Sequence, residues 1–524
     1  MRKRVVTVLL PLLGPVVPPS TAQVSPCAPQ GLVLETQGGT LGNSFAIDLS
    51  GGLPGAAGLV LFDTGGGPIP LSFGTFCVDF SPSLLTLPFN LDGAGALSLG
   101  GVLALNPQLG GQSSFIQGVA VDFTQPSFLA LSNGGVIRLL PPQLYLVDPG
   151  LVTPVGSTPG NLASFDALTN LPGFLAPLPG HAAAAVRVAP FGWIAVLQLD
   201  GSVLLIDELT GAVAQTAAFP PSLGAAHDLA YDGGDRLLAL FGGQPPSPFG
   251  GGVPGSLRAL SLSTLALGVV TPFATTNPDR ILLLDDPDLA YLGAGEEIVI
   301  ANHAAGVELG SVSLGTGAGD LVDWLVDGGR LITLHPGIAA NPFGGTYSPP
   351  GVNGVDLATG QPLFANPQTL ATTGLASLLR AGPGPSGPAL LVLLPDVGEI
   401  HLLNPADLVS FTAVAVPAGT GLLELSAGGS EWILVDSGSP TSPFAPPEPG
   451  NLLQMVPATL AVTSVSSLPD TAQTALVVLP SETLNRAYVL NGGNELLQLA
   501  TDPLASPGLP IPLPGSFSPP VLTN

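Results

Sequence analysis

The chain has 524 residues, of which 46% are hydrophobic and 9% are charged, and its formal net charge at pH 7 is -25. The high apolar content excludes an acidic disordered chain, and the negative charge makes nucleic acid and anionic membranes poor partners. The 70 glycines and 58 prolines cut the apolar runs into pieces of strand length, which favours an all-β fold.

The first 22 residues have the three parts of a secretory signal. Arg2-Lys3-Arg4 is basic, the run from Val5 to Val17 is apolar but too short to span a bilayer, and Ser20-Thr21-Ala22 supplies small residues before a cleavage point. Residues 1–22 are therefore predicted to be a signal peptide, and the rest of the chain to be secreted, to the periplasm, the cell surface or the medium. No later run reaches the roughly 20 uninterrupted apolar residues that a transmembrane helix needs.

The chain has two cysteines, Cys27 and Cys77. Because an exported chain meets oxidising conditions, the two are predicted to form one disulfide; the alternative is two separate buried thiols. The absence of a CxxC pair argues against thiol redox chemistry and against structural zinc.

Residues 23–140 are predicted to form a small antiparallel β-sandwich that serves as an accessory domain. Short apolar or alternating runs are separated by Gly, Pro and Asn at intervals of about ten residues, a pattern typical of sandwiches. Three such runs lie at residues 45–49, 58–62 and 76–80. Pro141-Pro142 forms a stiff boundary after this domain.

Residues 141–524 are predicted to form a β-propeller. After residue 180 one pattern recurs seven times: an apolar run, a small polar turn and a second apolar run. Repetition of a strand-turn-strand unit every 30 to 60 residues, roughly, is typical of propellers, because one unit cannot bury both faces of its sheet. The count gives seven blades, and a spare strand pair from Leu144 to Gly156 either closes the ring with the last blade or belongs to an eighth. The copies centre on Ala185-Val186-Arg187, Asp228-Leu229-Ala230-Tyr231, Asp288-Leu289-Ala290-Tyr291, Asp320-Leu321-Val322, Leu378-Leu379-Arg380, Leu423-Glu424-Leu425 and Ala475-Leu476-Val477-Val478.

Two resemblances accompany these patterns. In the second domain a strand ends in Asp and a Gly turn follows, as in Tyr145-Leu146-Val147-Asp148-Pro149-Gly150, Leu205-Ile206-Asp207-Glu208-Leu209-Thr210-Gly211 and Val355-Asp356-Leu357-Ala358-Thr359-Gly360. This sequence pattern resembles the YVTN/PQQ-like class of bacterial propeller repeats, which implies the fold but no particular ligand. Residues Gly38-Gly39-Thr40-Leu41-Gly42, Cys77 and Leu131-Ser132-Asn133, in that order, resemble an accessory sandwich of exported bacterial proteins, which implies export and display.

Three insertions carry the same Pro-Phe dipeptide. Their aromatic residues are Phe249, Phe343 and Phe444, spaced by 94 and 101 residues, and each insertion closes with Pro-Gly. Exposed rings between stiff prolines could anchor a partner at little ordering cost; alternatively each ring folds back and staples its own loop. This spacing of about two repeats indicates that the domain grew by duplication of a two-blade unit. In each unit one blade has a short connection at this position and the other has a long one.

Polar residues recur near the expected starts of the innermost strands. His181, His227, Asp228, Asp288 and Asp320 are predicted to line the mouth of the central channel together with Ser377 and Gln473. Carboxylates and imidazoles there could hold a hydroxyl-rich ligand or Ca²⁺. The alternative for each Asp is a structural role, accepting hydrogen bonds from turn amides. His303, His335 and His401 show no metal-ligand spacing and are expected in the core or on the surface.

No complete catalytic or cofactor motif occurs in the sequence. The chain is therefore expected to be a monomeric, non-enzymatic protein that recognises an extracellular protein or polysaccharide through one propeller face, with no cofactor other than a possible Ca²⁺. The alternative is a glycan hydrolase or lyase using the carboxylates of Asp228, Asp288 and Asp320, since such chemistry needs two carboxyl groups at a defined separation.

Overall fold

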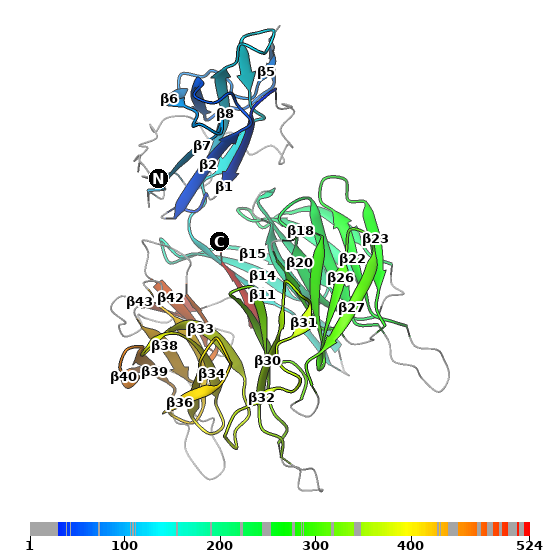
Figure 1. Cartoon of the computed structure of the whole chain (residues 1–524), viewed down its shortest axis with the longest axis vertical. Helices are drawn as coiled ribbons and strands as arrows, with labels where there is room; N and C mark the ends of the chain where they lie inside the picture. The colour runs from blue at the N-terminus through cyan, green and yellow to red at the C-terminus, as the bar shows by residue number, and fades with distance from the viewer. Residues whose placement is uncertain are drawn as a thin grey trace.

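A computed structural model of the chain shows an all-β protein (Figure 1). No helix in the described ranges is long and apolar enough to cross a membrane. The structure describes residues 30–523 apart from positions 38, 42, 72–73, 105, 107–108, 110–111, 154–155, 189–190, 221–223, 244–252, 275–277, 285, 287, 316–318, 340–346, 427–428, 430, 439–448, 469–472, 479–485, 492–494, 501–510 and 513–517.

The N-terminal part, residues 30–140, contains two small antiparallel sheets that share one hydrophobic core. The three-stranded sheet contributes Leu34 and Ile47 to this core, and the larger sheet contributes Val60, Phe62 and Ile116. The first sheet has the order β1 (Val33–Gln37), β2 (Ser44–Ser50), β7 (Leu97–Val102); the second has the order β10 (Gly135–Arg138), β8 (Ser113–Val121), β3 (Ala57–Asp63), β6 (Leu85–Asn90), with β9 (Leu129–Leu131) also on β8, and a separate hairpin joins β4 (Ile69–Leu71) to β5 (Gly74–Phe76).

Strand periodicity explains why these segments pair as they do. In β2, Ile47 and Leu49 are buried while Asp48 between them is more exposed, because successive side chains of a strand point to opposite faces. Cys77 follows β5 and is buried. Cys27 and the expected signal peptide lie outside the described residues, so the disulfide and the export signal stay predictions.

The repeat part, residues 143–523, contains eight antiparallel sheets of at least four strands among the described residues. Within each sheet the strands follow chain order from the first to the fourth, except that the first sheet takes its first strand from the C-terminus. Seven sheets are β16 (Ala182–Val188) to β19 (Val213–Ala218) through β17 (Trp193–Gln198) and β18 (Ser202–Asp207); β20 (Ala226–Tyr231), β21 (Arg236–Phe241), β22 (Ser256–Ser261), β23 (Leu267–Pro272); β24 (Arg280–Leu283), β25 (Leu289–Ala294), β26 (Glu297–Asn302), β27 (Val307–Ser313); β28 (Asp323–Asp327), β29 (Arg330–His335), β30 (Gly351–Asp356), β31 (Gln361–Pro362), with β32 (Gln368–Thr369) also on β30; β33 (Leu378–Gly384), β34 (Gly387–Leu394), β35 (Glu399–Leu403), β36 (Ser410–Ala415); β37 (Thr420–Leu425), β38 (Trp432–Asp436), β39 (Asn451–Val456), β40 (Ala461–Ser467); and β41 (Gln473–Val478), β42 (Arg486–Asn491), β43 (Glu495–Ala500), β44 (Ile511–Pro512).

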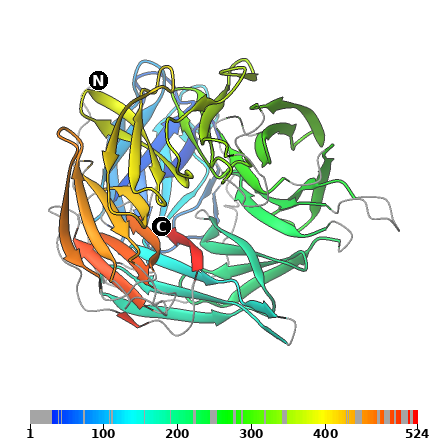
Figure 2. The ribbon, with the colours of Figure 1, turned by 90° about the horizontal axis from the view of Figure 1, so that it is seen from below.

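The remaining sheet joins the two ends of the repeat part. It has the order β15 (Leu171–Pro177), β14 (Asn161–Asp166), β11 (Gln143–Asp148), β45 (Ser518–Thr523), and a small hairpin of β12 (Leu151–Thr153) and β13 (Gly156–Thr158) lies between β11 and β14 in the chain. The C-terminal strand β45 contacts both β41 of the last sheet and β16 of the second sheet. Figure 2 shows the sheets around a common centre, with the C-terminus near it. This arrangement is consistent with a propeller.

Neighbouring sheets are held together by apolar side chains. One cluster combines Trp193 and Leu205 of the second sheet with Leu229 and Leu237 of the third, and other clusters join other successive sheets in the same way. Because each sheet is covered on both faces, the middle strands are mostly apolar and buried; all six residues of β17 are buried, and only the last of them, Gln198, is polar.

Strand register defines two opposite faces of the repeat part. Ala226 at the start of β20 pairs with Phe241 at the end of β21, which pairs with Ser256 at the start of β22. The starts of first strands and the connections between second and third strands therefore share one face, which we call the loop face. The connection is long in alternate sheets, between β21 and β22, β29 and β30, and β38 and β39.

The N-terminal part joins the repeat part on the opposite face. Arg138, the last residue of β10, forms an ion pair of 3.5 Å with Asp207 at the end of β18. Leu139 and Leu140 are buried, and the Leu140 amide donates to the Gly39 carbonyl at 2.9 Å. The linker between the two parts is thus itself packed and hydrogen-bonded.

Candidate functional site

The loop face is the candidate functional site. Phe249, Phe343 and Phe444, the expected aromatic anchors, lie outside the described residues, so their roles as anchors or staples stay predictions. The strands that flank them are described, and β21, β29 and β38 all end on the loop face. The three insertions consequently start and finish on one side of the repeat part.

Asp228 lies on this side but serves the framework. One carboxylate oxygen accepts the Leu229 amide at 2.8 Å, and the other accepts the Ile281 amide of the next sheet at 2.8 Å. Burial raises the pKa of Asp228, while the two amides and the charge of Arg280 oppose that rise. The contacts of Asp228 are thus structural, as in the alternative that assigns each Asp to backbone amides. Its carboxylate binds an amide of its own strand and also one of the next sheet.

Asp323 repeats the same contact two sheets later. Its carboxylate accepts the Trp324 amide at 3.0 Å and the Leu379 amide of the following sheet at 2.8 Å. The same oxygen lies 3.1 Å from Arg380, whose guanidinium also binds Glu424 of the sheet after that. Asp228 and Asp323 occupy equivalent positions, opposite Leu240 and Leu334, so the repeat carries an inter-sheet clamp.

Asp288 is not on the loop face, which corrects its expected place at the start of an innermost strand. The first strand of that sheet is β24, and Asp288 directly precedes the second strand, β25. Its side chain is 51% exposed on the opposite face, where it lies 3.6 Å from Arg236. In the sequence, acidic residues before Asp288 separate two apolar runs, and the pattern does not show which run is the first strand of the sheet.

His181 precedes β16 and is half-buried. Its Nδ1 atom lies so close to Gly150 that a Cβ atom there would approach it to 2.7 Å. His181 therefore packs against the end of the second strand of the first sheet on the loop face.

His227, Asp279 and Asp320 gather on the loop face at the starts of three successive first strands. All three side chains are exposed. Loss of part of its hydration raises the pKa of Asp279, the nearby charges of Arg280 and His227 lower it, and Asp320 raises it further. Two glycines at this edge lie beside the carboxylates: a Cβ atom on Gly293, in β25, would lie 3.5 Å from Asp279 Oδ1, and one on Gly295, in the turn after β25, would lie 3.3 Å from Asp320 Oδ1.

His335, at the end of β29, lies beneath this group. It is fully buried, and its Nδ1 atom is 2.9 Å from the Gly319 carbonyl, one residue before Asp320. Burial lowers the pKa of His335, although the Gly319 carbonyl and the charges of Glu296 and Asp320 act in the opposite sense. The ring thus holds in place the segment that enters β28.

The group of His227, Asp279 and Asp320 offers hydrogen-bond acceptors and negative charge on an open surface. Among the described residues, no set of three or more His, Cys, Asp or Glu side chains is arranged to hold a metal ion. The expected Ca²⁺ stays a prediction, because the insertions themselves are not described.

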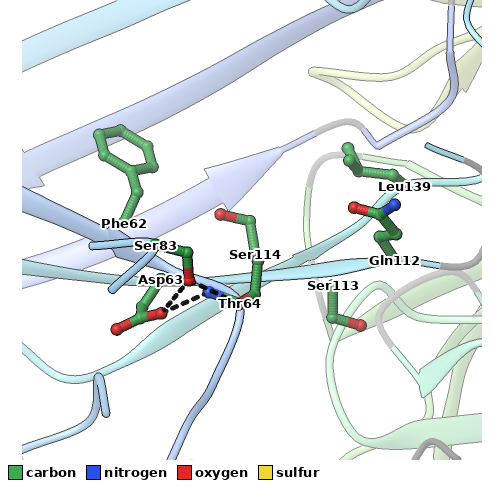
Figure 3. Close-up of a pocket in the computed structure, with 8 residues that line it drawn as sticks. All are labelled: Phe62, Asp63, Thr64, Ser83, Gln112, Ser113, Ser114 and Leu139. Atoms are coloured by element: carbon green, nitrogen blue, oxygen red, sulfur yellow. Dashed lines mark hydrogen bonds between the residues drawn. The ribbon is translucent and has the colours of Figure 1, made fainter. Parts of the chain in front are cut away.

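A polar pocket in the N-terminal part has a structural explanation (Figure 3). Asp63 lines it and accepts the Thr64 amide at 2.7 Å, the Ser81 amide at 2.8 Å and the Ser83 hydroxyl at 2.9 Å. Burial opposes ionisation of Asp63, but the hydrogen bonds from Ser81, Ser83 and Gly65 together lower its pKa. The Asp63 carboxylate therefore accepts hydrogen bonds from neighbouring protein groups, which gives it a structural role in this pocket. The other lining residues are Phe62, Gln112, Ser113, Ser114 and Leu139.

Comparisons with known proteins add little to this geometry. No protein-family model matches the chain, and no curated protein matches it. Two solved structures of AztD from Citrobacter koseri, one of them the apo form, are similar to it at 13% sequence identity and a TM-score of 0.49. The match covers 73% of this chain and 97% and 98% of the two AztD chains.

The sequence patterns did not assign four residues to the loop face: Asp279, Arg280, Asp323 and His335. A signal for the first two exists in the sequence, since Asp279-Arg280 precedes the apolar residues Ile281 to Leu284 as His227-Asp228 precedes Leu229. No comparable signal marks His335, because its place depends on the fold around it.

Proposed function

We propose that this protein is a secreted recognition protein that binds an extracellular protein or polysaccharide through the loop face. In this proposal residues 141–524 form an eight-bladed propeller of the YVTN/PQQ-like kind, and residues 23–140 form an accessory sandwich. The eight sheets and the position of β45 between β41 and β16 support the blade number over seven.

The observation that carries the proposal is the alternation of short and long connections on one face. Long second-to-third-strand connections occur in every other sheet, and register places all of them beside the starts of first strands. Connections that serve only to reverse the chain need no extra length; the equivalent turn between β25 and β26 uses two residues, Gly295 and Glu296. Long loops on a rigid scaffold are the usual carriers of binding residues.

The enzyme alternative has weaker support. Of its three carboxylates, Asp228 is engaged by two amides, Asp288 lies on the opposite face, and Asp320 alone is exposed on the loop face. Asp279 is a possible second acid, so the pair Asp279 and Asp320 is the one to test for glycan cleavage.

The test replaces Phe249, Phe343 and Phe444 together by alanine in the mature chain. Binding is measured on a glycan array and on immobilised extracellular-matrix proteins, with and without calcium, and thermal melting is measured in parallel. The proposal expects weaker binding with an unchanged melting temperature. A matched control replaces three exposed apolar residues of fourth strands by alanine and should leave binding intact: Leu171, Leu267 and Leu309, which are 61%, 47% and 58% exposed.

A lower melting temperature with unchanged binding would show that the rings staple their loops, and recognition through these insertions would be wrong. Cleavage of any glycan on the array, abolished by Asp279→Asn with Asp320→Asn, would replace the recognition proposal by the hydrolase or lyase.

A further inference from the structure

Two phenylalanines stand out at the tip of the N-terminal part. Phe123 and Phe128 are 76% and 60% exposed, the highest and third-highest values among the large apolar residues described. Their ring centroids are 6.3 Å apart and the rings are tilted by 56°. Both lie in the short turn between β8 and β9, so two aromatic rings form one small apolar surface.

Hydrogen bonds within the turn hold this surface in shape. The Asp122 carboxylate accepts the Thr124 amide at 2.8 Å and the Thr124 hydroxyl at 2.6 Å. The Phe128 amide donates to the Gln125 carbonyl at 3.0 Å, and the Asp122 amide donates to the Phe128 carbonyl at 3.0 Å. Hydrogen bonds from the Thr124 hydroxyl and amide lower the pKa of Asp122. Several polar groups of the turn are thus paired within it.

Phe128 adopts a backbone conformation that suits glycine. Its φ is +57°, in the left-handed region, where a side chain is disfavoured by contact with its own backbone. A phenylalanine in that position gains no burial in return, because most of its ring is exposed. Strained residues that fold stability does not explain are characteristic of binding surfaces.

The tip lies at the free end of the N-terminal part, which projects from the repeated sheets (Figure 1). Ser113, at the start of β8, pairs with Arg138 beside the junction, whereas Val121, at the other end of β8, pairs with Leu129 beside the tip. The length of β8 therefore separates the tip from the repeat part and from the loop face.

Charge limits what can bind there. Between residues 30 and 140 the sequence has one cation, Arg138, which lies at the junction end, and six carboxylates, at Glu35, Asp48, Asp63, Asp79, Asp92 and Asp122. An anionic surface would be repelled, and no cation is near enough to the tip to offset that repulsion.

We propose that the tip formed by Phe123 and Phe128 docks on an electrically neutral lipid surface. The two rings can enter the interface of a bilayer, which aromatic side chains favour, while the polar groups of the turn and the Asp122 carboxylate stay at the hydrated headgroup level. This attachment is separate from recognition by the loop face, and it would orient that face away from the lipid.

The experiment is flotation of the mature chain with phosphatidylcholine vesicles and with vesicles that also contain phosphatidylglycerol. The wild type should float with the neutral vesicles and less with the anionic ones. The variant Phe123→Ser with Phe128→Gly should lose roughly tenfold or more in partitioning, because it removes both apolar contacts. The control Phe411→Ser, at an exposed position of β36 in the repeat part, should float like the wild type.

Phe128→Gly alone separates docking from folding. Glycine adopts the observed φ without strain, so this variant should melt at the same temperature as the wild type or above it while floating less. A lower melting temperature would show that the ring supports the fold. Flotation only with anionic vesicles, equal flotation of all variants, or no flotation of the wild type would each overturn the proposal, and the last would point to an apolar pocket on another protein.

Discussion

The inter-sheet clamp at Asp228 gives the most direct test of how the repeats are joined. Asp228→Ala removes an acceptor that lies 2.8 Å from the Ile281 amide of the next sheet. A hydrogen bond to a charged group contributes about 1.5–3 kcal/mol. Taking about 2 kcal/mol for this one, loss of the acceptor should speed local opening at Ile281 by roughly thirtyfold, since 1.36 kcal/mol is a factor of ten.

Hydrogen–deuterium exchange read by mass spectrometry measures this effect where it arises. Peptides that cover β24 should exchange faster in Asp228→Ala than in the wild type, while peptides from the distant β37 and β38 should not change. Asp288→Ala is the control: its side chain is half exposed and 3.6 Å from Arg236, so we expect less than about 0.5 kcal/mol and no change at β24. Equal exchange at β24 in the two variants would refute the clamp.

Four further outcomes follow from the same contacts. Asp323→Ala should speed exchange in β33 as Asp228→Ala does in β24, because its carboxylate accepts the Leu379 amide at 2.8 Å, and an unchanged β33 would contradict the repeat of this contact. Arg187→Ala should lower the free energy of unfolding, measured in urea, by about 3–5 kcal/mol, because it leaves the fully buried Glu208 carboxylate, 2.8 Å away, without its cation. The double variant Arg187→Ala with Glu208→Gln should recover much of this loss. The pKa of His335 is lowered below 6.5 by burial, so the unfolded chain binds the proton more readily; wild-type melting temperature should fall as pH drops below 6.5, and His335→Asn should flatten that dependence. Phe128→Gly should keep or raise the melting temperature, as argued for the tip.

Much of the fold could be predicted because local rules determine it. Asp148 accepts the Gly150 amide at 2.9 Å, and Asp356 accepts the Thr359 amide at 2.8 Å, as the Asp-turn-Gly pattern indicates. The alternation of short and long corners was also visible in the spacing of the Pro-Phe dipeptides. These features depend on residues close together in the chain.

The closing strand β45 could not be read from its own residues. Ser518-Pro519-Pro520-Val521 contains two prolines, which lack the amide hydrogen that a central strand must donate. The strand tolerates them because it pairs on one side only, with β11, and the register shifts between Val147–Ser518 and Leu146–Val521. That pairing joins residues almost 380 positions apart, so only the closed arrangement of all the sheets reveals it.

The composition of the loop face was equally hard to predict, because it depends on which end of each strand faces which side. In the fourth repeated sheet the first strand is β24 and not β25, so Asp288 lies on the opposite face from the one predicted. Asp279 and Arg280 lie at the start of the first strand, where Asp288 was expected. Once the register is known, residues as distant as His227, Asp320 and His335 can be assigned to a common surface.

Charge is distributed unevenly between the two faces, and this bears on the proposal that the loop face binds a partner. Five arginines lie at or near strand ends on the opposite face, where they bind carboxylates, the Ala167 carbonyl or the Asn170 side chain: Arg138, Arg187, Arg236, Arg330 and Arg486. On the loop-face side, Arg258, Arg280 and Arg380 lie within two residues of a strand start, and Arg380 is paired with Asp323 and Glu424. The exposed carboxylates on this side are Asp200, Asp279, Asp320 and Asp396. A polyanionic glycan would meet this surface at an electrostatic disadvantage, so a neutral polysaccharide or a basic protein segment fits it better.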